Sequence, residues 1–187
     1  MWSAAVVLLA SSMIALAPQA ASGGGAVERE AMKKLAFFVG EWTGEGKVLA
    51  GPGAGEKSAV LEKAEMKLDG VVLVLEGLGK RKAADGSVTS EVVHNAFGVL
   101  TWDAKKGAYS MRAIKSDGAA VDAEAKFEGD NFVWGFEVPN GGRIRYTITF
   151  PEGRWHEVGE YTPDGGKTWM PVFEMTLEKT KAAAAAR

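Results

Sequence analysis

The stretch Gly40-Glu41-Trp42-Thr43-Gly44-Glu45-Gly46 decides the fold that we predict for this chain. Glycines two residues before and two and four residues after the tryptophan let a strand bend sharply and let another backbone approach it closely. In a closed antiparallel barrel, a large ring such as that of Trp42 plugs one end. We therefore expect Gly40 to begin the first strand of a closed β-barrel.

One short helix is predicted before this strand. From Val27 to Phe38, apolar residues recur at helical spacing and charged residues occupy the opposite face. After Glu41 the period falls from about 3.6 to about 2, the period of strands. Glycine-containing turn sequences, such as those at 85–86, 117–118 and 140–142, separate the alternating runs, as in consecutive hairpins. The pattern predicts an all-β fold: a single antiparallel up-and-down β-barrel of about ten strands with one short N-terminal helix.

The segment 35–46 resembles the N-terminal signature of calycin β-barrels. The chain is similar to the lipocalin-like and nitrobindin-related families, including an uncharacterised bacterial group of that type. The resemblance implies a barrel whose lumen holds a small molecule. In lipocalins an arginine late in the chain packs over the signature tryptophan, whereas the last strand here offers Lys179.

The length and composition fit one exported domain. The chain has 187 residues, no cysteine and a net charge of −2, which gives no electrostatic argument for a nucleic-acid partner. The apolar run from Ala4 to Ala17, followed by small residues, is typical of a cleavable signal peptide, although no lysine or arginine precedes it. We expect a signal peptide at 1–25, a barrel domain at 26–180, a disordered tail at 181–187, and a periplasmic or secreted protein with no stable membrane span after cleavage. An uncleaved anchor is the alternative.

Turn lengths near the C-terminus predict the register of the last four strands. A three-residue turn at 140–142 pairs Pro139 with Arg143, a two-residue turn follows at 152–153, and the next loop sets Tyr161 opposite Trp169. One face then carries most of the aromatic residues of this region. The residues on this face are Phe132, Trp134, Phe136, Val138, Ile144, Tyr146, Ile148, Phe150, Trp155, Glu157, Gly159, Tyr161, Phe173, Met175 and Leu177. We expect this face to point into the barrel.

The opposite face of the same strands gives an independent check. The predicted registers set Glu137 beside Arg145 and Arg145 beside Glu160, which makes a ladder of opposite charges across three strands. We expect this ladder to face water.

Two motifs at the C-terminal end are interpreted as structural. The segment 162–169 resembles the Asp-box, a hairpin turn of sialidases, but it occurs once and not once per propeller blade. We interpret it as a corner in which Asp164 binds backbone amides. The sequence His156-Glu157 suggests a zinc protease, but the second histidine is missing and neighbouring strand residues project to opposite faces. No metal site is expected.

The ligand hypothesis depends on Glu157, the one carboxylate on the predicted aromatic face. A buried carboxylate without a partner is unfavourable as an anion, so it should be neutral with a raised pKa or be held by a hydrogen bond. We interpret it as a polar anchor for a ligand; a position at the barrel rim, reaching solvent, is the alternative. The candidate ligand-binding residues are Glu157, Trp134, Tyr146, Trp155, Tyr161, Phe173 and Trp42.

Haem is a second ligand that the resemblance to nitrobindin-related proteins implies, because a histidine late in the chain holds haem there from inside the barrel. His156 is the only late histidine here. The predicted register places it on the water-facing ladder beside Thr149, which disfavours such a role. The face of the other histidine, His94, is not determined by the pattern.

The sequence therefore predicts an exported binding protein and not an enzyme. A run with small inward residues, Val121, Ala123, Ala125 and Phe127, leaves space for an apolar or amphipathic small molecule in the lumen. No nucleophile–base pair, phosphate loop or metal spacing points to catalysis. The alternatives are a haem-binding protein with haem chemistry and a ligand-free structural barrel of the cell envelope.

Overall fold

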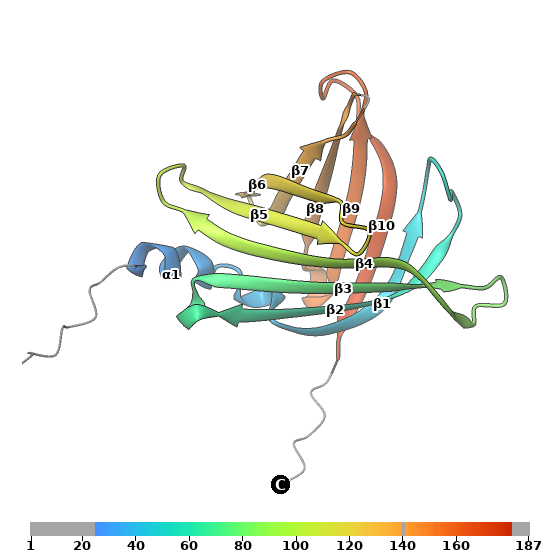
Figure 1. Cartoon of the computed structure of the whole chain (residues 1–187), viewed down its shortest axis with the longest axis horizontal. Helices are drawn as coiled ribbons and strands as arrows, with labels where there is room; N and C mark the ends of the chain where they lie inside the picture. The colour runs from blue at the N-terminus through green and yellow to red at the C-terminus, as the bar shows by residue number, and fades with distance from the viewer. Residues whose placement is uncertain (1–24, 140, 181–187) are drawn as a thin grey trace, which may run out of the picture.

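Ten strands form a closed antiparallel barrel in the computed structural model, which describes residues 25–139 and 141–180 (Figure 1). The strands follow one another around the barrel in chain order, and β1 closes onto β10. They are β1 (Gly40–Val48), β2 (Lys57–Lys67), β3 (Val72–Lys82), β4 (Val88–Asp103), β5 (Ala108–Lys115), β6 (Ala120–Glu128), β7 (Asn131–Glu137), β8 (Arg143–Thr149), β9 (Trp155–Thr162) and β10 (Met170–Lys179). The predicted fold class is confirmed. The predicted tail and all but the last residue of the predicted signal peptide lie outside the described residues.

The N-terminal helix lies at one end of the barrel. Helix α1 (Ala26–Lys33) is followed by a single 3₁₀ turn, η1 (Ala36–Phe38), so the predicted helix from 27 to 38 is divided in two. Met32 of α1 and Leu35 after it are completely buried, whereas Val27, predicted on the same apolar face, is 62% exposed. The hydroxyl of Tyr109 on β5 donates a hydrogen bond to the carbonyl oxygen of Ala31 at 2.8 Å. This contact fixes the helix to the barrel wall.

Aromatic side chains fill the same end of the barrel. Trp42 is 2% exposed, and its Nε1 donates a hydrogen bond to the carbonyl oxygen of Phe38 at 2.7 Å. Its ring lies edge-on to those of Phe150 and Trp155, at centroid distances of 5.6 and 5.9 Å. Such edge-to-face pairs are favourable beyond the area that they bury. Trp42 therefore closes one end of the barrel, as the sequence predicted.

Gly44 allows the two terminal strands to close the barrel. It lies opposite Leu177 of β10. A Cβ atom at position 44 would overlap the carbonyl oxygen of Thr176 and would lie 2.9 Å from the Cα of Leu177. Only glycine lets the backbones of β1 and β10 approach this closely.

Two of the predicted strand registers are wrong by about two residues. Trp134 lies opposite Tyr146 and not opposite Ile148, so Gly135 takes the place predicted for Glu137 beside Arg145. The cause is a longer connection, since β7 ends at Glu137 and β8 begins at Arg143. A slip of two residues keeps every side chain on its predicted face.

The second wrong register joins β9 to β10. Tyr161 lies opposite Met170, and a bulge between Pro171 and Phe173 then brings Met175 opposite Glu157. Proline cannot donate a ladder hydrogen bond, which explains the irregularity at this position. The aromatic face still points inward, as Phe132 at 1% exposure shows.

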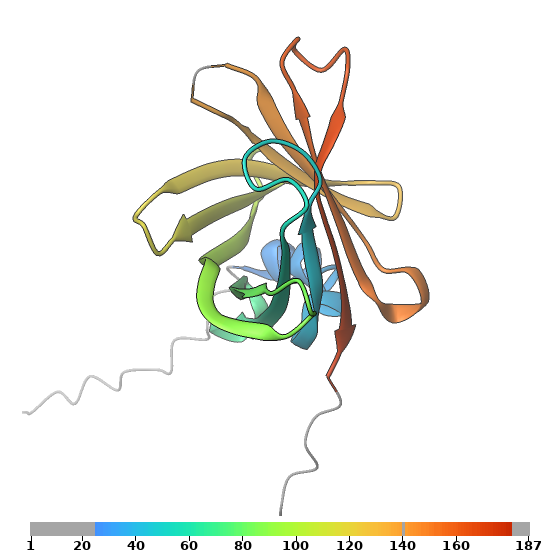
Figure 2. The ribbon, with the colours of Figure 1, turned by 90° about the vertical axis from the view of Figure 1, so that its right-hand side faces the viewer.

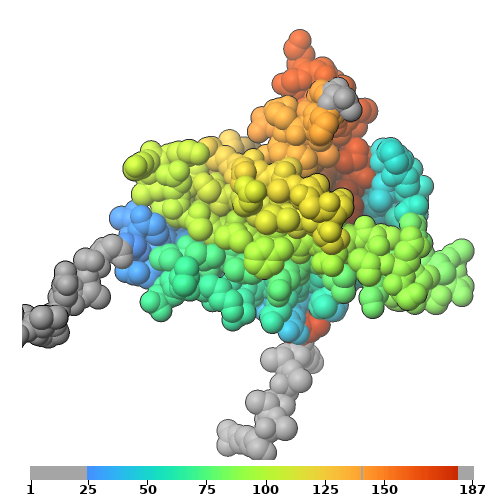
Figure 3. All heavy atoms as spheres, in the orientation of Figure 1, coloured from blue at the N-terminus to red at the C-terminus, as the bar shows by residue number. Residues whose placement is uncertain are grey.

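Predictions about the outer wall are confirmed in part. Arg145 and Glu160 form an ion pair at 2.7 Å, and Arg145 also lies over the ring of Trp169, 4.0 Å from its centroid. The Asp164 carboxylate accepts hydrogen bonds from the backbone amides of Lys167 and Thr168, both at 3.0 Å. The segment 162–169 is therefore a hydrogen-bonded corner. In the space-filling view, strands β3 to β6 lie side by side on the visible face (Figure 3).

The barrel opens at the end away from α1. Figure 2 views the barrel from that end and shows the hairpins spreading apart. Strands β6 and β7 pair only between 125–128 and 131–134, and they diverge beyond these residues. In the part of the chain that the structure describes, no helix has the length and apolar character needed to cross a membrane.

Candidate ligand site in the barrel lumen

The inner wall of the open half is not covered by the side chains of the barrel itself. Whereas the aromatic residues of the closed end are mostly buried, inward-facing residues of the open half keep partial contact with solvent. These partly exposed residues are Glu62, Leu75, Ala96, Ala113, Trp134, Phe136, Ile144, Tyr146, Tyr161 and Phe173. Solvent therefore reaches an apolar and largely aromatic inner surface.

Glu157 lies on this inner wall, next to the aromatic plug. It is 8% exposed, and its neighbours across the ladders are Ile148 and Met175. Its Oε2 accepts a hydrogen bond from Nε1 of Trp155 at 3.2 Å. Burial raises the pKa of Glu157 to about 7, and the hydrogen bond from Trp155 opposes this rise. At neutral pH this carboxyl is therefore poised between its acid and its anion.

A second inward carboxyl, Glu62 of β2, was not found by the sequence analysis. It lies opposite Trp42 on one side and opposite Gly77 on the other. It is partly exposed, and no hydrogen bond or ion pair joins its carboxyl to another described residue. Burial, and then the negative charge of Glu157, raise the pKa of Glu62 to about 8. In the sequence, Glu62 alternates with the rest of its strand as Val60 and Ala64 do, and this alternation indicates that Glu62 shares their inward face.

Glycine makes room for the Glu62 carboxyl. A Cβ atom at Gly77 would lie 2.5 Å from Oε1 of Glu62. The wall opposite the carboxyl is therefore backbone alone, and the carboxyl occupies the volume that a side chain at position 77 would fill.

A stacked aromatic pair stands on the wall near Glu157. The rings of Trp134 and Tyr146 are 4.6 Å apart at an interplanar angle of 17°. Gly159 leaves space for them, since a Cβ atom there would lie 2.8 Å from Cε1 of Tyr146. Burial, followed by the charge of Glu157, raises the pKa of Tyr146 to about 12, so its hydroxyl stays protonated at neutral pH.

The structure places two of the other predicted site residues, Trp42 and Tyr161, at opposite ends of the lumen. Trp42 and Trp155 belong to the buried plug, and Trp155 reaches the site through its hydrogen bond to Glu157. Tyr161 lies at the open end, where its hydroxyl donates a hydrogen bond to the carbonyl oxygen of Gly141 at 3.3 Å. Phe173 lies opposite Gly159 on the inner face. The fold thus gathers Glu157, Trp134, Tyr146 and Trp155, while Tyr161 is at the mouth and Trp42 at the floor.

The two histidines lie on opposite faces of the wall. His156 is on the outer face, with Nδ1 3.1 Å from Oγ1 of Thr176 and Nε2 3.9 Å from the carboxylate of Glu174. It therefore cannot hold a haem inside the barrel, and the residues do not fit the haem arrangement that the resemblance implied. His94 lies on the inner face opposite Gly79, near the open end. Burial, then the charge of Lys115, lowers its pKa.

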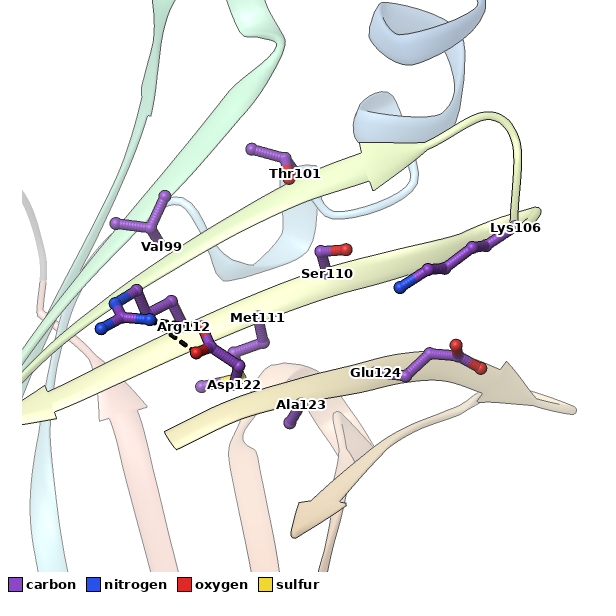
Figure 4. A pocket seen from close by; sticks show the side chains of 9 residues that line it. All are labelled: Val99, Thr101, Lys106, Ser110, Met111, Arg112, Asp122, Ala123 and Glu124. Atoms are coloured by element: carbon purple, nitrogen blue, oxygen red, sulfur yellow. Dashed lines mark hydrogen bonds and ion pairs between the residues drawn. The ribbon is translucent and has the colours of Figure 1, made fainter. Parts of the chain in front are cut away.

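Two hollows lie in the wall beside β6. One, of about 330 Å³, is a trough on β4, β5 and β6 in which Arg112 forms an ion pair with Asp122 (Figure 4). The other, of about 400 Å³, lies where β6 and β7 diverge. It is lined by residues of both faces of these strands, among them Val121, Ala123, Phe136, Asp122, Glu124 and Glu137. It therefore gives solvent a lateral access to the inner wall.

The chain matches no protein-family model and no curated protein. Among the described residues, no group of three or more histidine, aspartate or glutamate side chains is placed to hold a metal ion.

Proposed function

We propose that this protein is an exported binding protein whose barrel holds a small apolar or amphipathic molecule in its lumen. The observation that carries the proposal is the partial exposure of inward aromatic residues, above all Trp134, Tyr146 and Phe136. Apolar surface exposed to water inside a barrel is unfavourable, and a bound apolar molecule would remove it from solvent. Ligand pockets in proteins combine such apolar walls with a few polar groups that orient the ligand.

Export is the part of the proposal that depends on the apolar run from Ala4 to Ala17. The run has the length and composition of a signal peptide. We expect the purified protein from the exporting cell to begin between residues 21 and 27, which the mass of the intact chain measures. A mass that retains the first 20 residues would contradict cleavage.

A binding role is proposed in preference to catalysis because of the groups that point into the lumen. Those beside the stacked aromatic pair are the carboxyls of Glu62 and Glu157 and the hydroxyl of Tyr146, and none of the three lies in a nucleophile–base pair with another described residue. Such groups suit hydrogen bonding to a ligand.

Native mass spectrometry of the gently purified protein tests the proposal. We expect a non-covalent adduct of small-molecule mass that is lost on denaturation. A bare mass that stays bare after incubation with dodecanol, dodecanoate and dodecylamine would overturn the proposal and favour a ligand-free barrel. A haem-sized adduct would favour the haem alternative instead.

A further inference from the structure

The lumen contains acidic groups that lack a basic partner. Glu62 and Glu157 both face inward, and neither forms an ion pair with a described lysine, arginine or histidine. Trp155 satisfies one oxygen of Glu157, and no group of the described residues satisfies the carboxyl of Glu62. Buried carboxylates are normally paired with a cation or a metal.

The described basic groups at inward-facing ladder positions have other partners: Lys179 lies over the ring of Trp42 at the closed end, and Arg81 forms ion pairs with Glu56 and Glu91. Lys115 forms an ion pair with Asp117 at 3.2 Å. His94 lies near it, and its lowered pKa keeps the imidazole neutral at physiological pH. The titratable groups that face the two carboxyls are therefore each other and Tyr146, whose hydroxyl is neutral.

We propose that Glu62 and Glu157 form a two-carboxyl site for the ammonium group of an amphipathic amine, with the apolar part of the amine against Trp134 and Tyr146. This inference rests on the proposed function and specifies its ligand class. The ammonium group offers three hydrogen-bond donors, which the two carboxyls and the lumen water can accept. The aromatic faces add a favourable cation–π contribution.

Charge distinguishes this ligand class from the others that an apolar lumen could hold. A fatty acid would bring a third carboxyl into a region where two already repel each other as anions. A neutral alcohol would leave the carboxyls without a counter-charge. An ammonium group replaces the protons that the two carboxyls otherwise retain, and charges attract more strongly in a lumen than in bulk water.

Three probes of equal chain length test the inference on the full chain: dodecylamine, dodecanol and dodecanoate. Isothermal titration calorimetry at pH 8 measures their affinities, with tryptophan fluorescence as a second signal. Dodecylamine keeps its positive charge at this pH, since alkylamines titrate near the lysine value of about 10.4. We expect dodecylamine to bind at least about tenfold more tightly than dodecanol, and dodecanoate to bind most weakly.

Variants assign the effect to the two carboxyls. We expect Glu62→Gln and Glu157→Gln each to weaken dodecylamine binding about tenfold or more and to leave dodecanol binding within about threefold. Glu76→Gln is the matched control, because Glu76 is on the outer face of β3 and is exposed. Glutamine keeps the size of glutamate, so circular dichroism should show an unchanged fold for all three variants.

The outcomes separate the inference from the proposed function. If none of the three probes binds, the proposed function fails and the inference fails with it. If all three bind with similar affinity, or dodecanoate binds most tightly, the lumen is a binding site but the inference is overturned. Equal loss of dodecylamine and dodecanol binding in Glu62→Gln would also overturn it, because the carboxyl would then act through the shape of the lumen and not through its charge.

Discussion

The Nζ atom of Lys179 lies 5.0 Å from the centroid of the Trp42 ring, across the seam where β10 pairs with β1. The last strand therefore places a cation over the face of the tryptophan in the first strand. The edge of the ring is held as well, since its Nε1 donates a hydrogen bond to the carbonyl oxygen of Phe38. The first and last strands and the N-terminal segment thus meet at a single side chain.

Replacement of Trp42 should destabilise the closed end of the barrel, where these segments contact one another. We expect Trp42→Phe to lower the free energy of unfolding by about 2–4 kcal/mol, because it removes a buried hydrogen bond and leaves a cavity in the plug. Lys179→Met keeps the aliphatic stem and removes the charge, so it should cost only about 0.5–1 kcal/mol. Urea denaturation measures both. Equal costs for the two variants would contradict a central role for the indole.

Gly44 should be the least replaceable glycine of the first strand. We expect Gly44→Ala to cost at least about 2–3 kcal/mol or to prevent folding, because its methyl group would overlap the backbone of β10. Gly98→Ala is the matched control, since a Cβ there would lie 3.4 Å from Cβ of Leu75, an ordinary contact. We expect the control to stay within about 0.5 kcal/mol of the parent. Thermal unfolding of the two variants checks the contrast, and a stable Gly44→Ala protein would show that β10 can move away.

The architecture could be predicted from the sequence because local patterns determine it. Alternation with a period of two assigns residues to faces, and the glycine-containing turns mark the hairpins. These patterns cannot detect a register shift of two residues, because such a shift leaves every side chain on the same face of the sheet. That is why Arg145 was correctly paired with Glu160 across a short turn but was placed beside Glu137 in error across a longer one.

The candidate site was predicted only in part for a related reason. Glu157 stood out because aromatic residues surround it in the sequence pattern of its own and neighbouring strands. Glu62 lies in a stretch rich in alanine and charged residues, and its importance follows from distant residues, Gly77 and Glu157, that only the closed barrel brings near it. Local periodicity cannot show which inward residues meet across a lumen.

The corner at 162–169 should lose stability when Asp164 is replaced. The pKa of Asp164 is held well below its usual value, first by the hydrogen bond from the Thr168 hydroxyl and then by backbone amides. A lowered folded-state pKa means that the contribution is present above the unfolded-state pKa and is lost as the pH falls toward the folded-state value. We therefore expect Asp164→Ala to lower the Tm at pH 7 and the difference from the parent to shrink toward pH 2.5.

A control separates this corner from a general effect of removing an exposed aspartate. Asp130→Ala changes an exposed aspartate in the turn between β6 and β7, and none of the hydrogen bonds described here involves its carboxylate. We expect its Tm to match the parent at both pH values. A similar loss of Tm in both variants would mean that the hydrogen bonds of Asp164 do not stabilise the corner.

Glu62 should make the protein less stable at alkaline pH. Its pKa is raised by burial and by the charge of Glu157, so the folded state binds its proton more tightly than the unfolded state does. The stabilising contribution is therefore fully present below the unfolded-state pKa of about 4.3 and is lost as the pH rises through about 8. We expect the free energy of unfolding of the parent protein to fall between pH 5 and pH 9.

Glu62→Gln should remove much of this decline. At pH 4 we expect the variant and the parent to differ by less than about 0.5 kcal/mol, since Glu62 is then largely neutral in both the folded and the unfolded state. At pH 9 we expect the variant to be more stable by roughly 1–3 kcal/mol, less than full burial would give, because each pKa unit corresponds to about 1.4 kcal/mol and Glu62 keeps some contact with water. Urea denaturation at the two pH values measures this, with Glu76→Gln as the control. A variant that is less stable than the parent at pH 9 would mean that the ionised Glu62 is already balanced by a positive charge, and the argument for an uncompensated acidic lumen would fail.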